Sequence, residues 1–225
     1  IEQDTVEYEH IDKDIEADII VFATKHQSRS GIPSFSVHVP GNFGEPMFGG
    51  EHGHLCPAQA DLMYHCLHRL ADLQEGSNLP HEVVYEATHH GPATDTPTMF
   101  IEIGSQEKYW KDPQAGKIVA QALIEGIDQL GTATPPAIIG IGGLHTCPSF
   151  TKLALRRQAM VGHVCPVYML DRLSEGLVDQ MIEKTDPEPT AVVLDWKGLK
   201  SHKQHVRDML EHVSLEIRRT KDYKS

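Results

Sequence analysis

The sequence predicts an α/β protein, a three-layer α/β/α sandwich built around a mixed, mostly parallel sheet. Strand-like runs recur along the chain, and amphipathic helical segments lie between them. Two of the runs, residues 18–23 (DIIVFA) and 137–141 (AIIGI), are apolar almost throughout, as in strands that are buried on both faces. Strands that alternate with helices form parallel sheets with helices on both sides.

The predicted strands are short and rich in branched or aromatic residues. They cover residues 18–23, 34–39, 82–87, 98–103, 137–141, 162–169 and 190–196. The run at 34–39 (SFSVHV) alternates polar and apolar side chains, which is typical of a strand at a sheet edge. In that interpretation, His38 is an exposed strand side chain.

The predicted helices carry apolar residues at helical spacing. They cover residues 57–73, 112–130, 148–158, 173–184 and 201–219. Asp112 followed by Pro113 is a favourable N-cap and first turn, and Pro148 can open the next helix. In the last segment, Val206, Leu210 and Ile217 belong to one apolar stripe, which predicts a terminal helix.

Length and composition predict one globular domain. The 225 residues are enough for one large α/β domain, and no linker divides residues 1–225. No apolar run approaches the roughly 20 residues that cross a bilayer, so no membrane association is expected. The first residue is Ile1 rather than methionine, and we expect a short N-terminal segment to precede it. The four cysteines form no C-x-x-C pair, which favours a reducing, cytoplasmic location.

The net charge of −12 argues against general DNA or RNA binding, which depends on neutralising phosphates. The charge is unevenly distributed along the chain. Residues 1–103 contain 17 acidic and 4 basic side chains, whereas residues 196–225 contain 4 acidic and 8 basic ones. The end of the chain is therefore where contact with a polyanion is expected, although a basic run can also be a solvated surface.

The most informative feature is His89-His90-Gly91-Pro92, which follows the apolar run at 83–88. Adjacent side chains of an extended strand point to opposite faces, so both imidazoles reach one site only if the strand ends there. A second loop, Gly142-Gly143-Leu144-His145, follows another strand. In parallel sheets, ligands bind outside the carboxyl ends of strands, so these loops and His26 predict the rim of an active site. The alternative is a pair of ordinary turns with locally bonded histidines.

Two acids near the predicted strand ends, Glu102 and Asp195, need partners because a buried unpaired carboxylate is costly. Histidines and carboxylates together are the ligands of catalytic zinc sites. No H-E-x-x-H or other sequential zinc motif is present, so spacing alone assigns no ligand set. The chain also has no G-x-S-x-G elbow, phosphate-binding P-loop or G-x-G-x-x-G fingerprint after a strand.

Five segments in one order point to a known family. They are residues 26–42 (HQSRSGIP with SVHVPGN), 86–92 (EATHHGP), 98–105 (TMFIEIGS), 140–148 (GIGGLHTCP) and 195–200 (DWKGLK). Together they resemble the archaeal and plant-type D-aminoacyl-tRNA deacylases over nearly the whole chain. One departure is Thr146, where the pattern has an aromatic residue after the loop histidine.

The resemblance implies a fold like that of phosphorylases and zinc-peptidase-type hydrolases. It also implies zinc as cofactor and hydrolysis of the ester between a D-amino acid and the terminal ribose of tRNA. Carried over to this chain, it places His26, His89 and Glu102 on the metal, and His90 or His145 in proton transfer. The backbone N–H groups of Gly142 and Gly143 are then expected to meet the developing oxyanion.

The implied partner is the acceptor end of D-aminoacyl-tRNA, bound by a monomer. Its phosphates are expected on the basic end of the chain, at Lys197, Lys200, Lys203 and Arg207. A zinc-dependent peptidase or amidohydrolase acting on a small substrate is the alternative, since it uses the same site without a basic surface. A non-catalytic RNA-binding protein is a further alternative, which the acidic net charge disfavours.

Overall fold

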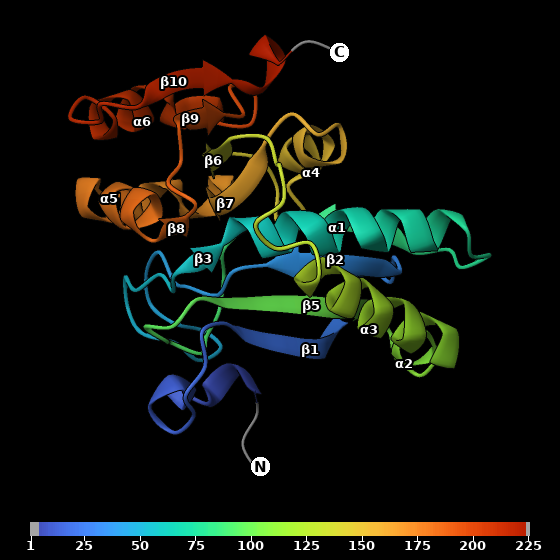
Figure 1. Cartoon of the computed structure of the whole chain (residues 1–225). Coiled ribbons are helices and arrows are strands. Elements are labelled where there is room, and N and C mark those ends of the chain that lie inside the picture. Colours follow the sequence, from blue (N-terminus) through green and yellow to red (C-terminus); the bar gives the residue numbers. More distant parts are fainter. Residues whose placement is uncertain (1–4, 224–225) are drawn as a thin grey trace.

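A computed structural model describes residues 5–223 of the chain (Figure 1). The strands are β1 (Ile20–Gln27), β2 (Ser34–His38), β3 (Ala58–Gln59), β4 (Glu82–Tyr85), β5 (Thr98–Ser105), β6 (Ala137–Ile141), β7 (Met160–Cys165), β8 (Thr185–Asp186), β9 (Ala191–Leu194) and β10 (Glu216–Arg219). The α-helices are α1 (Ala60–Glu75), α2 (Glu107–Trp110), α3 (Pro113–Ile127), α4 (Pro148–Leu155), α5 (Glu175–Glu183) and α6 (Lys203–Met209). Helix α3 begins as predicted, with the Asp112 carboxylate accepting from the Gln114 N–H at 2.8 Å.

The first four-stranded sheet has the order β1-β5-β2-β4 and is mixed. β5 is parallel to β1, whereas β2 is antiparallel to β5 and parallel to β4. Alternate side chains of β2 and β5, among them Phe35, Val37 and Ile101, are buried in the main core with residues of α1 and α3. The side chains between them belong to the opposite face of the sheet. Thr24, Glu102 and Ser36 lie side by side there in register.

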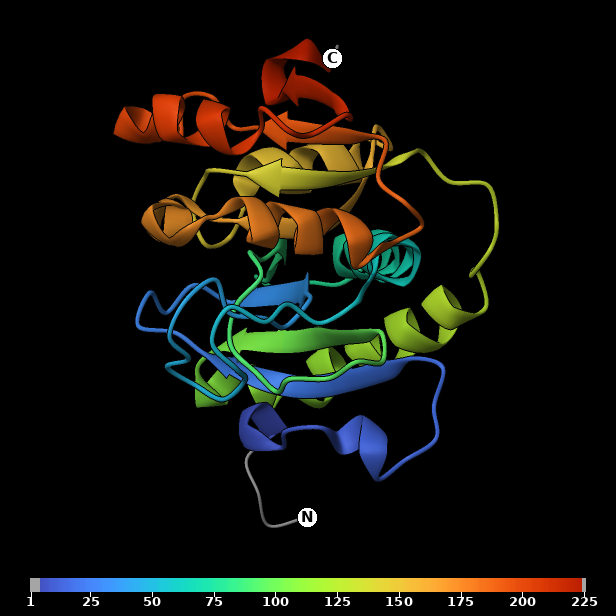
Figure 2. The same cartoon turned by 90° about the vertical axis from the view of Figure 1, so that its left-hand side faces the viewer.

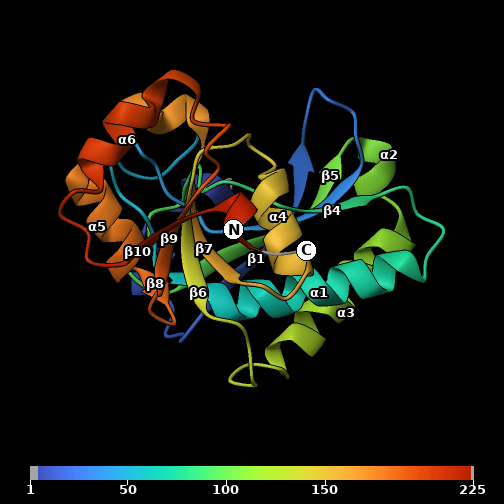
Figure 3. The same cartoon turned by 90° about the horizontal axis from the view of Figure 1, so that it is seen from above.

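The second four-stranded sheet, β10-β9-β6-β7, is entirely parallel. Its side chains alternate between two cores: Ile138 and Val193 face the main core, while Ile139 and Val192 pack with α5 and α6. Helices α5 and α6 lie on one side of this sheet, and α1 and α4 lie on the other (Figures 2 and 3). The α/β class, the mixed and mostly parallel strands and the layered arrangement are confirmed.

The two sheets meet where the chain leaves β4. The N–H of Thr88 donates to the Val164 carbonyl of β7 at 3.0 Å, and the N–H of Val164 donates to the Thr88 hydroxyl at 3.1 Å. The imidazole of buried His163 lies 3.2 Å from the same hydroxyl. The residues immediately before His89 are therefore fixed against the second sheet.

Two predictions about secondary structure are wrong. The terminal helix predicted at 201–219 ends at Met209, and residues 216–219 instead form β10 beside β9. Val206 and Leu210 do pack in the core, but Ile217 is largely exposed, so the apolar stripe does not continue. β2 is an interior strand, and His38 is fully buried because polar residues of other elements cover its face. Within residues 5–223, no helix combines the length and apolarity needed to cross a membrane.

Candidate active site

Five histidines and two glutamates gather over the polar face of the first sheet. We call them the histidine–glutamate cluster; its members are His26, His38, Glu86, His89, His90, Glu102 and His145. β1, β2 and β5 supply His26, His38 and Glu102 from strand positions. The loops that follow β4 and β6 supply the other four residues. The site therefore combines a sheet face with loop residues from both sheets.

The centre of the cluster is buried and holds polar atoms without hydrogen bonds. His38 Nδ1 lies 3.6 Å from Glu86 Oε2 and 3.9 Å from Glu102 Oε2. None of these three atoms has a hydrogen-bond partner among the described residues, and all three residues are nearly inaccessible to solvent. Thr24 donates to the other carboxylate oxygen of Glu102 at 2.7 Å. Buried groups of this kind require a proton or a cation between them.

His89 and His90 both reach the cluster because the backbone changes conformation between them. His90 has φ +43°, outside the extended region, and the two rings lie 4.3 Å apart between centroids. His89 Nδ1 is 2.7 Å from the Ala87 carbonyl, and His90 Nδ1 is 2.6 Å from the Gly91 carbonyl. A carbonyl only accepts, so each Nδ1 carries the proton and each Nε2 presents its lone pair. This is the arrangement of metal-binding histidines.

His26 and His145 lie on the more open side of the cluster. His26 Nδ1 is 3.5 Å from Glu102 Oε2, and His145 Nε2 is 3.7 Å from Glu86 Oε2. His145 Nδ1 also lies 3.0 Å from the hydroxyl of Tyr168. The side chain of His145 is 35% exposed, compared with 0% for His38. Solvent or substrate can therefore reach His145.

Burial and charge shift the pKa values within the cluster. Burial raises the pKa of Glu86 to about 7. Burial, assisted by His26 and His90, lowers the pKa of His145 to about 4, so that this imidazole is neutral at pH 7. The pKa of His26 is raised, mainly by its interaction with Glu102. Strongly shifted groups that face one another in this way are typical of catalytic sites.

The sequence-predicted residues His26, His89, His90, Glu102 and His145 are all brought together. His38 was misassigned as an exposed side chain, and Glu86 was missed. Both lie on one face because β2 and β4 are parallel neighbours, a pairing that the sequence pattern does not reveal. Three overlapping groups of residues could each hold one cation. They are His38, His89 and His90; His26, Glu86 and His145; and His38, Glu86 and Glu102. The predicted ligands His26, His89 and Glu102 are divided among these sets.

The glycine loop differs from the prediction. Gly142 (φ +97°) and Gly143 (φ +88°) adopt backbone conformations that favour glycine, and a Cβ on Gly142 would lie 2.9 Å from Leu199. The N–H of Gly142 donates to the Cys165 carbonyl at 2.8 Å, so it is already used and does not supply an oxyanion contact. Asp195 is not in the cluster; it accepts from the Ser149 hydroxyl and the Gly198 N–H.

Basic side chains near the end of the chain surround Trp196. The cationic groups of Lys203, Arg207 and Arg219 lie 5.5, 4.9 and 4.3 Å from its ring centroids. Lys197 lines an adjoining hollow together with Arg219, Lys152 of α4 and Arg156, which directly follows α4. Lys200 is exposed on the same loop. The sequence prediction named Lys197, Lys200, Lys203 and Arg207, but not the contributions of α4 and β10.

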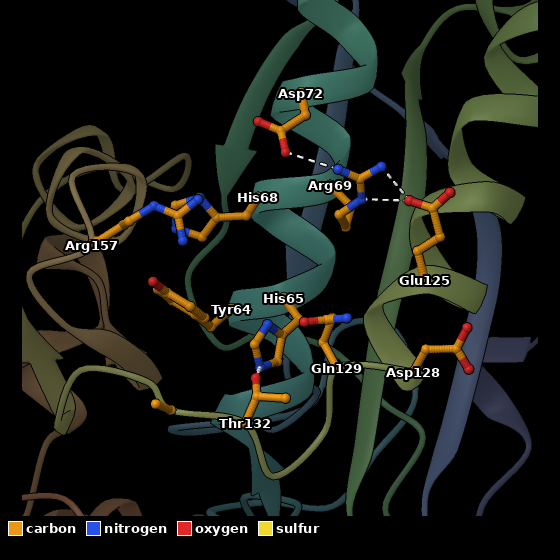
Figure 4. A pocket seen from close by; sticks show the side chains of 11 residues that line it. Tyr64, His65, His68, Arg69, Asp72, Glu125, Asp128, Gln129, Thr132 and Arg157 are labelled. Atoms are coloured by element: carbon orange, nitrogen blue, oxygen red, sulfur yellow. Dashed lines mark hydrogen bonds and ion pairs between the residues drawn. The ribbon is translucent and has the colours of Figure 1, made fainter.

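A separate hollow lies between α1 and α3 (Figure 4). Arg69 of α1 donates there to Asp72 at 3.0 Å and forms an ion pair with Glu125 of α3. His65 lies 3.0 Å from the Asp61 carboxylate. No member of the histidine–glutamate cluster lines this hollow. The Arg69–Glu125 pair connects α1 with α3 and points to a structural role.

Comparison with known proteins supports a single assignment. Residues 13–218 match the family model described as D-aminoacyl-tRNA deacylase. A D-aminoacyl-tRNA deacylase of Thermococcus kodakarensis is 37% identical over 96% of this chain and 80% of the relative. One of Ignicoccus hospitalis is 36% identical over 89% of this chain and 80% of the relative.

The fold agrees with that assignment. A crystal structure described as a conserved protein of unknown function superposes with a TM-score of 0.90 at 28% identity, over 98% of this chain and 79% of the other. The family match begins before β1 and ends within β10, and it includes every residue of the histidine–glutamate cluster. The chain therefore belongs to the D-aminoacyl-tRNA deacylase family and is an enzyme of the deacylase class.

Proposed function

We propose that this protein hydrolyses the ester bond of D-aminoacyl-tRNA with the help of zinc, releasing the D-amino acid and tRNA. The observation that carries the proposal is the histidine–glutamate cluster itself, which lies inside the family match. At its buried centre, polar atoms of His38, Glu86 and Glu102 have no hydrogen-bond partner among the described residues. The proposal includes a cytoplasmic location. The four free thiols, Cys56, Cys66, Cys147 and Cys165, favour that location.

The donor set fits zinc. Imidazole nitrogens and carboxylate oxygens are the ligands that catalytic zinc takes besides thiolates. His38 Nε2 and His90 Nε2 lie 3.2 Å apart, and His89 joins them within the same set. We assign His38, His89 and His90 as the principal zinc ligands. The neighbouring carboxylates of Glu86 and Glu102 would supply negative charge close to the metal. When bound, zinc supplies a water of lowered pKa and polarises the ester carbonyl.

His145 is the best-placed group for proton transfer. Its imidazole is neutral, partly exposed and held by Tyr168 on one side and Glu86 on the other. In the proposed reaction, His145 takes the proton of the attacking water as the oxygen bonds to the ester carbon. It then gives that proton to the ribose oxygen as the ester C–O bond breaks. Glu86 orients the ring and stabilises its protonated form.

Removal of metal tests the cofactor. Protein dialysed against a chelator is expected to lose at least 90% of its D-aminoacyl-tRNA hydrolysis and to regain it with stoichiometric zinc. The L-aminoacyl-tRNA of the same amino acid serves as the control substrate and is expected to remain intact throughout. Full activity of metal-depleted protein, checked by elemental analysis, would overturn the zinc assignment. Equal hydrolysis of the D- and L-esters would overturn the proposed substrate.

The basic residues around Trp196 are proposed to hold tRNA phosphates. They gather on a protein whose net charge is −12, so the contact surface is local and suits an acceptor end better than a long duplex. Trp196 adds an aromatic ring to these cations. Aromatic rings beside basic groups are typical of proteins that bind single-stranded nucleic acid ends.

Replacing Lys197, Lys200 and Lys203 by glutamine in one variant is expected to raise KM for aminoacyl-tRNA about tenfold or more without lowering kcat. Each lost phosphate contact reduces the slope of log affinity against log salt by about 0.7–0.9. Lys117→Gln is the control, because Lys117 is an exposed lysine on α3, away from Trp196. The measurement is kcat/KM across a salt series. Unchanged kinetics would favour the alternative, a hydrolase that acts on a small substrate.

A further inference from the structure

An apolar hollow of ≈ 200 Å³ opens directly beside the histidine–glutamate cluster. One wall is formed by His89, His90 and Tyr168, which belong to the cluster or contact it. The remaining wall is largely apolar and comes from the loop after β2, from Thr88 after β4 and from the segment after β7. Its lining residues are Asn42, Phe43, Glu45, Met47, Phe48, Thr88 and Met169. The reacting centre and the hollow therefore share a boundary.

Two of the lining side chains are unusually exposed for their type. Met47 is 82% exposed and Phe48 is 65% exposed. Large apolar side chains that remain in solvent at the edge of a catalytic site are typical of ligand-binding surfaces. The loop that carries them is anchored to the catalytic turn, because the Gly91 N–H donates to the Phe48 carbonyl at 2.9 Å. The Asn42 amide also donates to the Gly49 carbonyl at 3.0 Å.

We propose that this hollow binds the side chain of the amino acid being released, and that Phe48 and Met47 set a preference for large apolar and aromatic side chains. The inference rests on the proposed esterase function, because that function places the ester carbonyl at the cluster. The amino-acid side chain lies one carbon away from that carbonyl. It must therefore occupy space that adjoins the cluster, as this hollow does.

Size and chemistry favour a side chain over the other neighbouring part of the substrate, the terminal adenosine. The hollow is smaller than the roughly 300–1,000 Å³ of sites for whole small molecules. An adenine also requires hydrogen-bonding groups, and the Asn42 amide is already used by Gly49. The Glu45 carboxylate is largely exposed and lies 3.2 Å from His52. The lining therefore offers a ligand mainly apolar contact.

The test compares two D-aminoacyl-tRNAs that carry the same tRNA body, one charged with D-phenylalanine and one with D-alanine. Phe48→Ala is expected to lower kcat/KM for the D-phenylalanyl ester about 10–200-fold. It is expected to change the D-alanyl ester less than threefold, because a methyl group does not reach the lost ring. Met169→Trp, which fills the hollow, is expected to reject D-phenylalanine selectively in the same way.

Ile124→Ala is the matched control, since Ile124 is 62% exposed on α3 and does not line the hollow. It is expected to leave both substrates unchanged. Equal losses for both esters in Phe48→Ala would overturn the inference and point to adenosine or to a general positioning role. Unchanged kinetics for both would overturn it as well. If the wild type hydrolyses neither ester, the proposed function itself fails, which is a separate outcome.

Discussion

Replacing His145 with alanine is expected to lower kcat for D-aminoacyl-tRNA hydrolysis about 10²–10⁴-fold, the usual contribution of general acid–base catalysis. The reason is that His145 is the neutral, accessible imidazole of the histidine–glutamate cluster. Its partner Tyr168 is more than half exposed, so the substitution leaves the buried centre of the cluster intact. Single-turnover kinetics at saturating enzyme give the effect on chemistry directly, and zinc content should remain that of the wild type.

His212→Ala provides the control, because His212 is exposed, pairs with Asp179 on the surface and is not a member of the histidine–glutamate cluster. It should retain wild-type turnover. A His145→Ala variant that binds aminoacyl-tRNA normally but hydrolyses it at more than a tenth of the wild-type rate would remove His145 from proton transfer.

Replacing Glu86 with glutamine is the second change with a large expected effect. It is expected to lower zinc affinity without lowering the melting temperature of the zinc-free protein. Glu86 Oε2 lies within 4.0 Å of nitrogens of His38, His89 and His145 and has no hydrogen-bond partner among residues 5–223. The neutral amide removes charge from beneath the metal, so zinc affinity is expected to fall at least about 10–100-fold, and activity with it. Without metal, the buried carboxylate is a cost to the fold. The zinc-free variant should therefore melt at the same temperature as zinc-free wild type or higher.

Calorimetric zinc titration and thermal melting with and without zinc measure both effects. Glu82→Gln is the control, because Glu82 is exposed at the start of β4, the strand that Glu86 directly follows. It should change neither quantity. A zinc-free Glu86→Gln protein that melts well below zinc-free wild type would show that Glu86 supports the fold rather than the metal.

The sequence located the site histidines that follow apolar runs, but it did not locate His38 or Glu86. His89, His90 and His145 follow apolar runs and precede glycine or proline, so the turn chemistry locates them. His38 and Glu86 have no such signal. Their approach depends on β2 running antiparallel to β5 while pairing in parallel with β4, a long-range arrangement. The strand-end rule assumes a parallel sheet, whereas the first sheet is mixed.

The end of the chain shows a different limit. The spacing of Val206, Leu210 and Ile217 satisfies a helical stripe, yet only its first part is helical. Residues 216–219 extend the second sheet at its open edge, where backbone pairing with β9 outweighs a weak helical pattern. The role of Gly142 also depends on its neighbours. Its N–H donates to the Cys165 carbonyl because β6 pairs with β7, and the sequence pattern does not reveal that pairing.

Placing side chains of the candidate active site on the face of the first sheet couples strand alignment to the proposed activity. Thr24, Glu102 and Ser36 stand in one row across β1, β5 and β2, and Ile101 and Ile103 face the opposite side. A slip of one residue in β5 would move Glu102 into the apolar core and an isoleucine into the reaction centre. Misaligned molecules would thus be inactive as well as unstable. At full metal loading, the specific activity of a preparation is therefore expected to fall as the fraction of molecules with misaligned strands rises.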